Sequence, residues 1–161
     1  MTHVDGAGSA HMVDVTSKPW TRRRALARCR VTLGPSDVQP SGRDPDTASV
    51  SPSALGQVFA TARIAGINAA KKTSALVPLC HSLPLSGIEL RLALLPDGVG
   101  IESEVTTTGP TGVEMEALTA CVFAALNVVA QLGETRSDVS IEDLTVWEKS
   151  GGKSGHWKRP R

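Results

Sequence analysis

The chain has 161 residues, of which 40% are hydrophobic and 20% charged, and its net charge is +1. This length fits one domain, residues 1–161, and the balanced charge excludes an overall field that would recruit nucleic acid or a membrane surface. With three Trp, two Phe and no Tyr, a stacking platform for single-stranded nucleic acid is not expected. The N-terminus has no apolar segment of the kind found in export signals, so we predict a cytoplasmic protein.

The three cysteines, Cys29, Cys80 and Cys121, are odd in number and form no CxxC pair. A disulfide framework or a structural zinc site would need paired or clustered cysteines. We therefore expect reduced thiols, no bound metal and no cofactor.

The N-terminal part of the chain contains one predicted strand. Residues 1–10 are small and polar and are expected to be loose, as are residues 156–161. The arginine run at positions 22–24 indicates a solvated face, with anion binding as the less common alternative. Residues 25–33, ALARCRVTL, carry interrupted apolar alternation that predicts the first strand.

A long loop precedes the first predicted helix. Residues 35–53 combine four prolines with serines and aspartates, a composition that disfavours packed structure and predicts a flexible loop. Residues 54–72 then show helical periodicity, and Ser53 is positioned as an N-cap.

Two strands follow as a hairpin. Residues 87–95 alternate between apolar and polar side chains, and Pro96, Asp97 and Gly98 form a turn signal before a second alternating run at 99–105. A last strand is predicted within residues 138–149.

Between the hairpin and the last strand, residues 111–132 form the longest apolar run of the chain. Their length and alanine content favour a helix over a strand, and the run is a poor match for a membrane span. Its expected buried face comprises Leu118, Cys121, Val122, Ala125, Leu126, Val129 and Leu132. The order βαββαβ predicts an α+β, ferredoxin-like fold, with a four-stranded antiparallel sheet and two helices on one face.

Two carboxylates, Glu114 and Glu116, lie in the first turn of this helix. They complement the helix dipole in any protein, although the same helix end can also dock an anionic ligand. At 3.6 residues per turn they lie about 200° apart around the helix, so we expect that they do not both face one pocket of one subunit.

The pair Cys80 and His81 lies between Pro78 and Pro84 in a constrained, non-helical segment. His81 is a candidate general acid or base, although a structural, hydrogen-bonded histidine is the more common case. Residues 148–156, with glycines and two lysines, resemble a phosphate cradle or a flexible basic tail. They are no P-loop, because Trp147 stands where the first glycine would have to be.

Five blocks occur in order along the chain, at residues 11–14, 59–66, 78–81, 111–120 and 149–155. Their sequences, HMVD, FATARIAG, PLCH, TGVEMEALTA and KSGGKSG, together resemble the MoaC family, the cyclic pyranopterin monophosphate synthases of molybdenum-cofactor biosynthesis. The resemblance implies a hexamer built as a trimer of dimers, with an active site at a subunit interface. It also implies a small-molecule, phosphorylated substrate, 3′,8-cyclo-7,8-dihydro-GTP. The balanced charge and the few aromatic residues give no reason to expect a nucleic acid or membrane partner.

At the matching positions, the resemblance implies catalysis by His81, Glu114 and Glu116. It implies substrate binding by Met115, Arg63, Lys71, Lys149, Lys153 and Cys80. Three positions depart from the family pattern. Where the pattern reads Lys-Gly-Asp-Val, this chain has Leu55 in place of a catalytic lysine, and where it reads Tyr-Asp-Met-Cys-Lys, Ala130 and Gly133 replace an acid and a second catalytic lysine.

These departures remove acid and base groups that ring-opening chemistry uses. The first hypothesis is therefore a diverged enzyme of lyase, isomerase or cyclase type in a specialised-metabolite pathway. The alternative is the synthase reaction itself, and a third hypothesis is a non-catalytic subunit that retains the hexamer.

Overall fold

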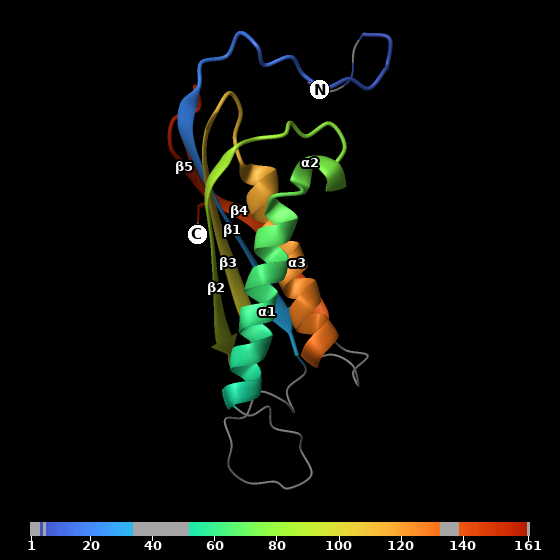
Figure 1. Cartoon of the computed structure of the whole chain (residues 1–161), viewed down its shortest axis with the longest axis vertical. Helices are drawn as coiled ribbons and strands as arrows, with labels where there is room; N and C mark the ends of the chain where they lie inside the picture. Colours follow the sequence, from blue (N-terminus) through green and yellow to red (C-terminus); the bar gives the residue numbers. More distant parts are fainter. Residues whose placement is uncertain (1–3, 5, 34–51, 133–138, 161) are drawn as a thin grey trace, which may run out of the picture.

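The chain folds into two layers, an antiparallel sheet and a pair of long helices that lie side by side on one face of it (Figure 1). The computed structural model describes residues 4, 6–33, 52–132 and 139–160. The elements are β1 (Thr21–Thr32), α1 (Pro52–Ala70), α2 (Thr73–Leu76), β2 (Leu85–Leu95), β3 (Gly98–Gly109), α3 (Glu114–Leu132), β4 (Ser140–Ser150) and β5 (Trp157–Lys158). The strand order β2-β3-β1-β4-β5, all antiparallel, confirms the α+β, ferredoxin-like prediction.

The sheet has five strands rather than the predicted four. Strand β5 pairs with the end of β4 through Glu148 opposite Lys158 and Lys149 opposite Trp157. The connecting turn contains Gly151, Gly152 and Gly155 at positive φ, a conformation that glycine adopts without steric cost. The terminus expected to be loose over residues 156–161 therefore contributes a strand.

Two further boundaries differ from the sequence prediction. Strand β1 begins at Thr21 rather than at residue 25, so the arginines at 22–24 belong to it. Helix α1 begins at Pro52, which places the last residues of the predicted 35–53 loop in the helix. Residues 35–51 lie outside the described part of the chain.

Strand β1 is the centre of the sheet and separates a core face from a charged face. Ala25, Ala27, Cys29 and Val31 alternate along it and are buried in the core. On the other side, arginines pair with carboxylates of neighbouring strands; Arg28, for example, contacts Glu102 at 2.6 Å. The period of two that defines a strand thus sorts apolar from charged side chains.

The buried face of helix α3 is narrower than predicted and consists of smaller residues. The fully buried positions are Ala117, Ala120, Cys121, Ala124, Ala125 and Val128. Leu126, expected in the core, is 47% exposed. Gly66 of α1 packs so closely against α3 that an added Cβ would lie 2.7 Å from the Ala120 carbonyl oxygen. Because α1 and α3 are in close contact, only small side chains fit between them, and larger side chains such as Leu126 lie on the outer face of α3.

By length and composition α3 is also apolar enough to cross a membrane, but 44% of that stretch is buried inside the protein. Its contacts with α1, β1 and β3 are those of a core helix.

Candidate active site

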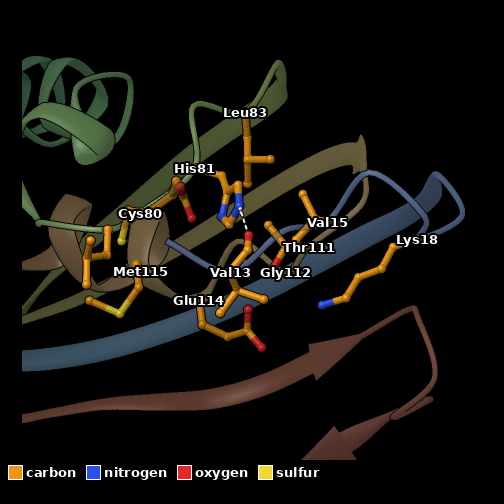
Figure 2. Close-up of a pocket in the computed structure, with 12 residues that line it drawn as sticks. Val13, Val15, Lys18, Cys80, His81, Leu83, Thr111, Gly112, Glu114 and Met115 are labelled. Atoms are coloured by element: carbon orange, nitrogen blue, oxygen red, sulfur yellow. Dashed lines mark hydrogen bonds between the residues drawn. The ribbon is translucent and has the colours of Figure 1, made fainter. Parts of the chain in front are cut away.

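Three segments distant in sequence meet at the N-terminal end of α3 and line a cavity of about 260 Å³ (Figure 2). They are the stretch before β1, the connection between α2 and β2, and the turn that opens α3. The lining residues are Val13, Val15, Lys18, Leu79, Cys80, His81, Leu83, Thr111, Gly112, Glu114, Met115 and Glu116. We call this space the first cavity.

His81 is fixed from two sides. Leu79, two residues before it, has φ of 66°, a conformation that disfavours an ordinary L-residue by about 1–2 kcal/mol and is typical of segments shaped for function. The His81 Nε2 atom lies 2.7 Å from the Val13 carbonyl oxygen (Figure 2). A carbonyl only accepts, so Nε2 carries the proton and Nδ1 of the neutral ring is free to accept one.

Glu116 is the buried carboxyl group of the cavity, with 4% of its surface exposed. Its pKa is raised from 4.5 to about 7, chiefly by burial and to a smaller extent by the nearby charge of Glu114, while a hydrogen bond from its own backbone N–H acts in the opposite direction. Burial, and secondarily the charge of Glu116, also raises the pKa of the Cys80 thiol. Near neutral pH, Glu116 can therefore either donate or accept a proton, whereas Cys80 is a thiol.

Glu114 lines the same cavity, so the prediction that the two carboxylates cannot share one pocket was wrong. The geometry of the helix gives only the directions of the Cα–Cβ bonds, and the Glu114 side chain folds back over Gly112. A Cβ on Gly112 would lie 1.9 Å from a Glu114 carboxylate oxygen, so glycine is required for this position of the carboxylate. Glu114 Oε1 is 3.0 Å from Lys149 Nζ.

A second, polar cavity of about 210 Å³ adjoins the first and shares Thr111, Gly112 and Glu114 with it. Its cationic residues are Arg23, Arg24 and Lys149. The expected solvated face of residues 22–24 is therefore wrong for two of the three arginines, since Arg22 is exposed whereas Arg23 and Arg24 are half-buried.

The two arginines of the second cavity have different partners. Arg23 donates from Nε to the Gly109 carbonyl at 3.1 Å and from an Nη to the Pro110 carbonyl at 3.0 Å, and so fixes the turn before α3. Arg24 pairs with Glu104 at 2.8 Å and Glu148 at 2.7 Å, and these contacts raise its pKa. The Arg23 guanidinium thus lies at the second cavity, and in these contacts its hydrogen-bond partners are backbone carbonyls.

The cavities gather some of the predicted site residues and not others. His81, Cys80, Glu114, Met115 and Glu116 line the first cavity, and Lys149 lines the second. Arg63, Lys71 and Lys153 line neither: Arg63 donates to the Leu90 carbonyl at 3.3 Å, and the two lysines are exposed.

The structure adds three residues that the sequence analysis did not assign to the site: Lys18, Arg23 and Thr111. Lys18 follows the HMVD block by four residues, and Thr111 opens the block TGVEMEALTA. For Lys18 and Thr111, a place inside or near a matched block was the signal that could have identified them, and for Arg23 it was the anion-binding alternative for the arginine run at 22–24.

The positions that depart from the family pattern lie at the other end of the helices. Leu55 is in the first turn of α1 and Ala130 in the last turn of α3, at the foot of both helices in Figure 1. At 1.5 Å per residue, Ala130 is about 24 Å along the helix from Glu114. Gly133 lies outside the described residues.

A polar cluster occupies the helix surface at that end. Gln131 donates to Thr61 Oγ1 at 2.7 Å and to Asn127 Oδ1 at 2.6 Å, which links α3 to α1. Within the described ranges, no three His, Cys, Asp or Glu side chains are grouped as a metal site.

Comparison with known proteins supports the resemblance. The MoaC family matches residues 12–152. The chain is 48% identical over 161 residues to "Cyclic pyranopterin monophosphate synthase" of Heliobacterium modesticaldum, covering 99% of this chain and 97% of that protein. It is 46% identical to the protein of the same name from Streptomyces avermitilis, covering 99% of this chain and 89% of that protein.

A plant relative has a longer chain. The chain is 45% identical to "Cyclic pyranopterin monophosphate synthase, mitochondrial" of Arabidopsis thaliana, over 99% of this chain and 57% of that protein. The chain thus spans less than two thirds of the plant protein and nearly all of the Heliobacterium one.

Proposed function

Because the chain belongs to the MoaC family, we propose that it is a lyase and cyclase that forms cyclic pyranopterin monophosphate in molybdenum-cofactor biosynthesis. Its substrate would be 3′,8-cyclo-7,8-dihydro-GTP, and pyrophosphate would leave as the cyclic phosphate forms. The names of the relatives support this reaction, which the sequence analysis weighed as the alternative.

The observation that carries the proposal is the convergence of proton-transfer groups beside a cationic cavity. His81 presents a free Nδ1, and Glu116 has a pKa of about 7. A carboxyl group whose pKa lies near the working pH, as that of Glu116 does, is an efficient acid or base for opening and closing rings. Arg23 and Lys149 lie in the adjoining cavity, where they can hold the phosphates of the same substrate.

The assay is incubation of the purified full chain with the cyclised GTP intermediate, followed by detection of pyranopterin and of pyrophosphate. The proposal expects both products in equal amounts. Substrate that remains intact after prolonged incubation with an excess of the protein would overturn it.

A second candidate function is the repurposed enzyme, and it is favoured by the apolar side chains at Leu55 and Ala130 together with Gly133. None of these side chains can transfer a proton. The restored variant Leu55→Lys, Ala130→Asp, Gly133→Lys separates the two candidates. Turnover that appears only in this variant would support repurposing of a pocket that still accepts the synthase substrate, and absence of binding in both proteins would point to a non-catalytic subunit.

We also propose that the protein assembles as a homohexamer and acts in the cytoplasm. Within one chain, Ala130 lies about 24 Å along α3 from Glu114. The C-terminal end of α3 could therefore contact the first cavity only of another copy. Ile64, Phe123 and Leu126 are large apolar side chains exposed on α1 and α3, as expected of a surface that meets another copy. Native mass spectrometry should give six copies, and a monomer at micromolar concentration would contradict the assembly.

A further inference from the structure

Residues 11–20, which precede β1, form one wall of the first cavity without belonging to a helix or a strand. We call this segment the strap. It contributes Val13, Val15 and Lys18 to the lining of the cavity. In Figure 1 it runs beyond the end of the sheet, apart from the two long helices. The wall on this side of the cavity is therefore a single stretch of chain rather than part of the packed core.

Few contacts attach the strap to the fold. Its side chains are exposed except those of Val13 and Val15, which are half-buried. Its backbone turn is local, since the Lys18 N–H donates to the Val15 carbonyl at 3.0 Å. Among the described residues, one hydrogen bond joins the strap to the rest of the fold, from His81 Nε2 to the Val13 carbonyl at 2.7 Å (Figure 2). A segment with so little buried surface and one anchoring bond opens at a small fraction of the free energy of unfolding.

We propose that the strap is a lid over the first cavity and that the hydrogen bond between His81 and the Val13 carbonyl is its latch. The lid opens to admit a small-molecule ligand and closes over it, which excludes water from Glu116. Closure also sets the form of His81, because Nε2 must carry the proton while it donates to the carbonyl, and Nδ1 is then left to accept one. This last consequence rests on the proposed function, whereas the movement of the lid does not.

Cys80 can report the opening of the lid. It lines the first cavity and is half-buried, whereas Cys29 and Cys121 are buried in the core. The test is the rate at which a bulky thiol reagent, fluorescein maleimide, labels each cysteine of the native full chain, as located by peptide mass mapping. Cys80 should be labelled well before the two core cysteines, and more slowly than in the urea-unfolded chain. One common rate for all three thiols would mean access by global unfolding, and an unfolded-like rate at Cys80 would mean that the strap covers nothing; either result would overturn the lid.

Substitutions within the strap separate a lid from a passive surface segment. Val13→Ala combined with Val15→Ala removes methyl groups that are about half-buried, so the double variant should label Cys80 about tenfold faster than the wild type. The matched control is Met12→Ala, because Met12 lies in the same strap but is 54% exposed and lines neither cavity. The control should label at the wild-type rate. An unchanged rate in the double variant, or an equal acceleration in the control, would contradict the proposal.

The latch is tested by two replacements of the histidine. Leucine fills the space of the ring but cannot donate a hydrogen bond, so His81→Leu should speed the labelling of Cys80 by about three- to tenfold, the factor for one hydrogen bond. Glutamine can donate to the Val13 carbonyl through its amide, so His81→Gln should label within about twofold of the wild type. Equal rates in the two variants would overturn the latch. Because labelling is measured without substrate, these outcomes do not depend on whether the protein converts the cyclised GTP intermediate.

Discussion

The two ends of α3 face different surroundings. At its N-terminal end, Glu114 and Glu116 meet His81 from the connection between α2 and β2. At its C-terminal end, Ala130 is apolar, and neutral side chains link the helix to α1. The first end has a carboxyl group, Glu116, whose pKa is raised by burial, and the second has neutral side chains that hold no mobile proton.

This contrast separates what the helix does for the fold from what it does for chemistry. Small buried residues such as Ala120 and Ala124 along its middle fix the helix on the sheet, and that packing would serve either end equally well. Only the N-terminal end couples the helix to a cavity with a desolvated carboxyl group. If proton transfer is confined to that end, substitutions there should change turnover, and substitutions elsewhere on the helices should change stability.

The largest expected effect is on turnover. His81→Ala removes the imidazole beside Glu116 and should lower the rate on the cyclised GTP intermediate by about 10²- to 10⁴-fold, the usual contribution of a positioned acid or base. The matched control is His156→Ala, since His156 is exposed and contacts Glu148 outside the first cavity. Comparable losses in both variants would show that the rate does not depend on the N-terminal end.

The second effect is a pH-dependent gain in stability from Glu116→Gln. The unfolded carboxyl group ionises above its usual pKa of 4.5 and the folded one only above about 7. The folded state therefore binds more protons between these values, and the stability of the wild type falls as pH rises through that window. The fall is at most about 3 kcal/mol.

Glutamine has no such charge to bury, so Glu116→Gln should be more stable than the wild type at about pH 8 and similar to it at about pH 4. Urea denaturation at both pH values measures the difference in unfolding free energy. Glu142→Gln, which changes an exposed carboxylate of β4, should show no gain at the higher pH. A Glu116→Gln difference that is the same at both pH values would mean that the carboxyl group is not desolvated.

A third test compares two glycines of α1. An added Cβ at Gly66 would lie 2.5 Å from a Leu90 side-chain carbon and 2.7 Å from the Ala120 carbonyl oxygen, whereas at Gly56 it would meet nothing within 4 Å. Gly66→Ala should destabilise the protein by about 1–3 kcal/mol through overpacking. Gly56→Ala should stabilise it by about 0.5–1 kcal/mol through helix propensity. Equal effects in urea denaturation would indicate that α1 and α3 are not in close contact at Gly66.

The sequence predicted the elements of the fold well because apolar periodicity reports directly on helices and strands. It did not predict β5, because Trp157 and Lys158 pair with β4 through a glycine-dependent turn and carry no periodic pattern. It also placed Leu126 in the core, since periodicity ranks residues by hydrophobicity. Close packing against Gly66 instead selects the alanines of α3.

The candidate site was partly predictable, and the missing parts have a common cause. His81, Glu114 and Glu116 were identified through motif blocks, and all three line the first cavity. That both glutamates face one cavity depends on the side-chain path over Gly112, and the position of Lys18 at the cavity follows a turn closed by one backbone hydrogen bond. The spacing of residues along the sequence carries no information on such tertiary contacts.

The smallest expected effect is at the C-terminal end of α3. Gln131→Ala removes the hydrogen bonds to Thr61 and Asn127 that link the two helices. Exposed neutral hydrogen bonds contribute little, so we expect a loss of about 0.5–1 kcal/mol and a fall of roughly 1–4 °C in Tm. Affinity for GTP at the cavities of the same chain should not change, because this end lies about 24 Å along α3 from Glu114. A drop in turnover of about tenfold or more with normal folding would place this helix end in the functional site of another copy, as in the proposed hexamer.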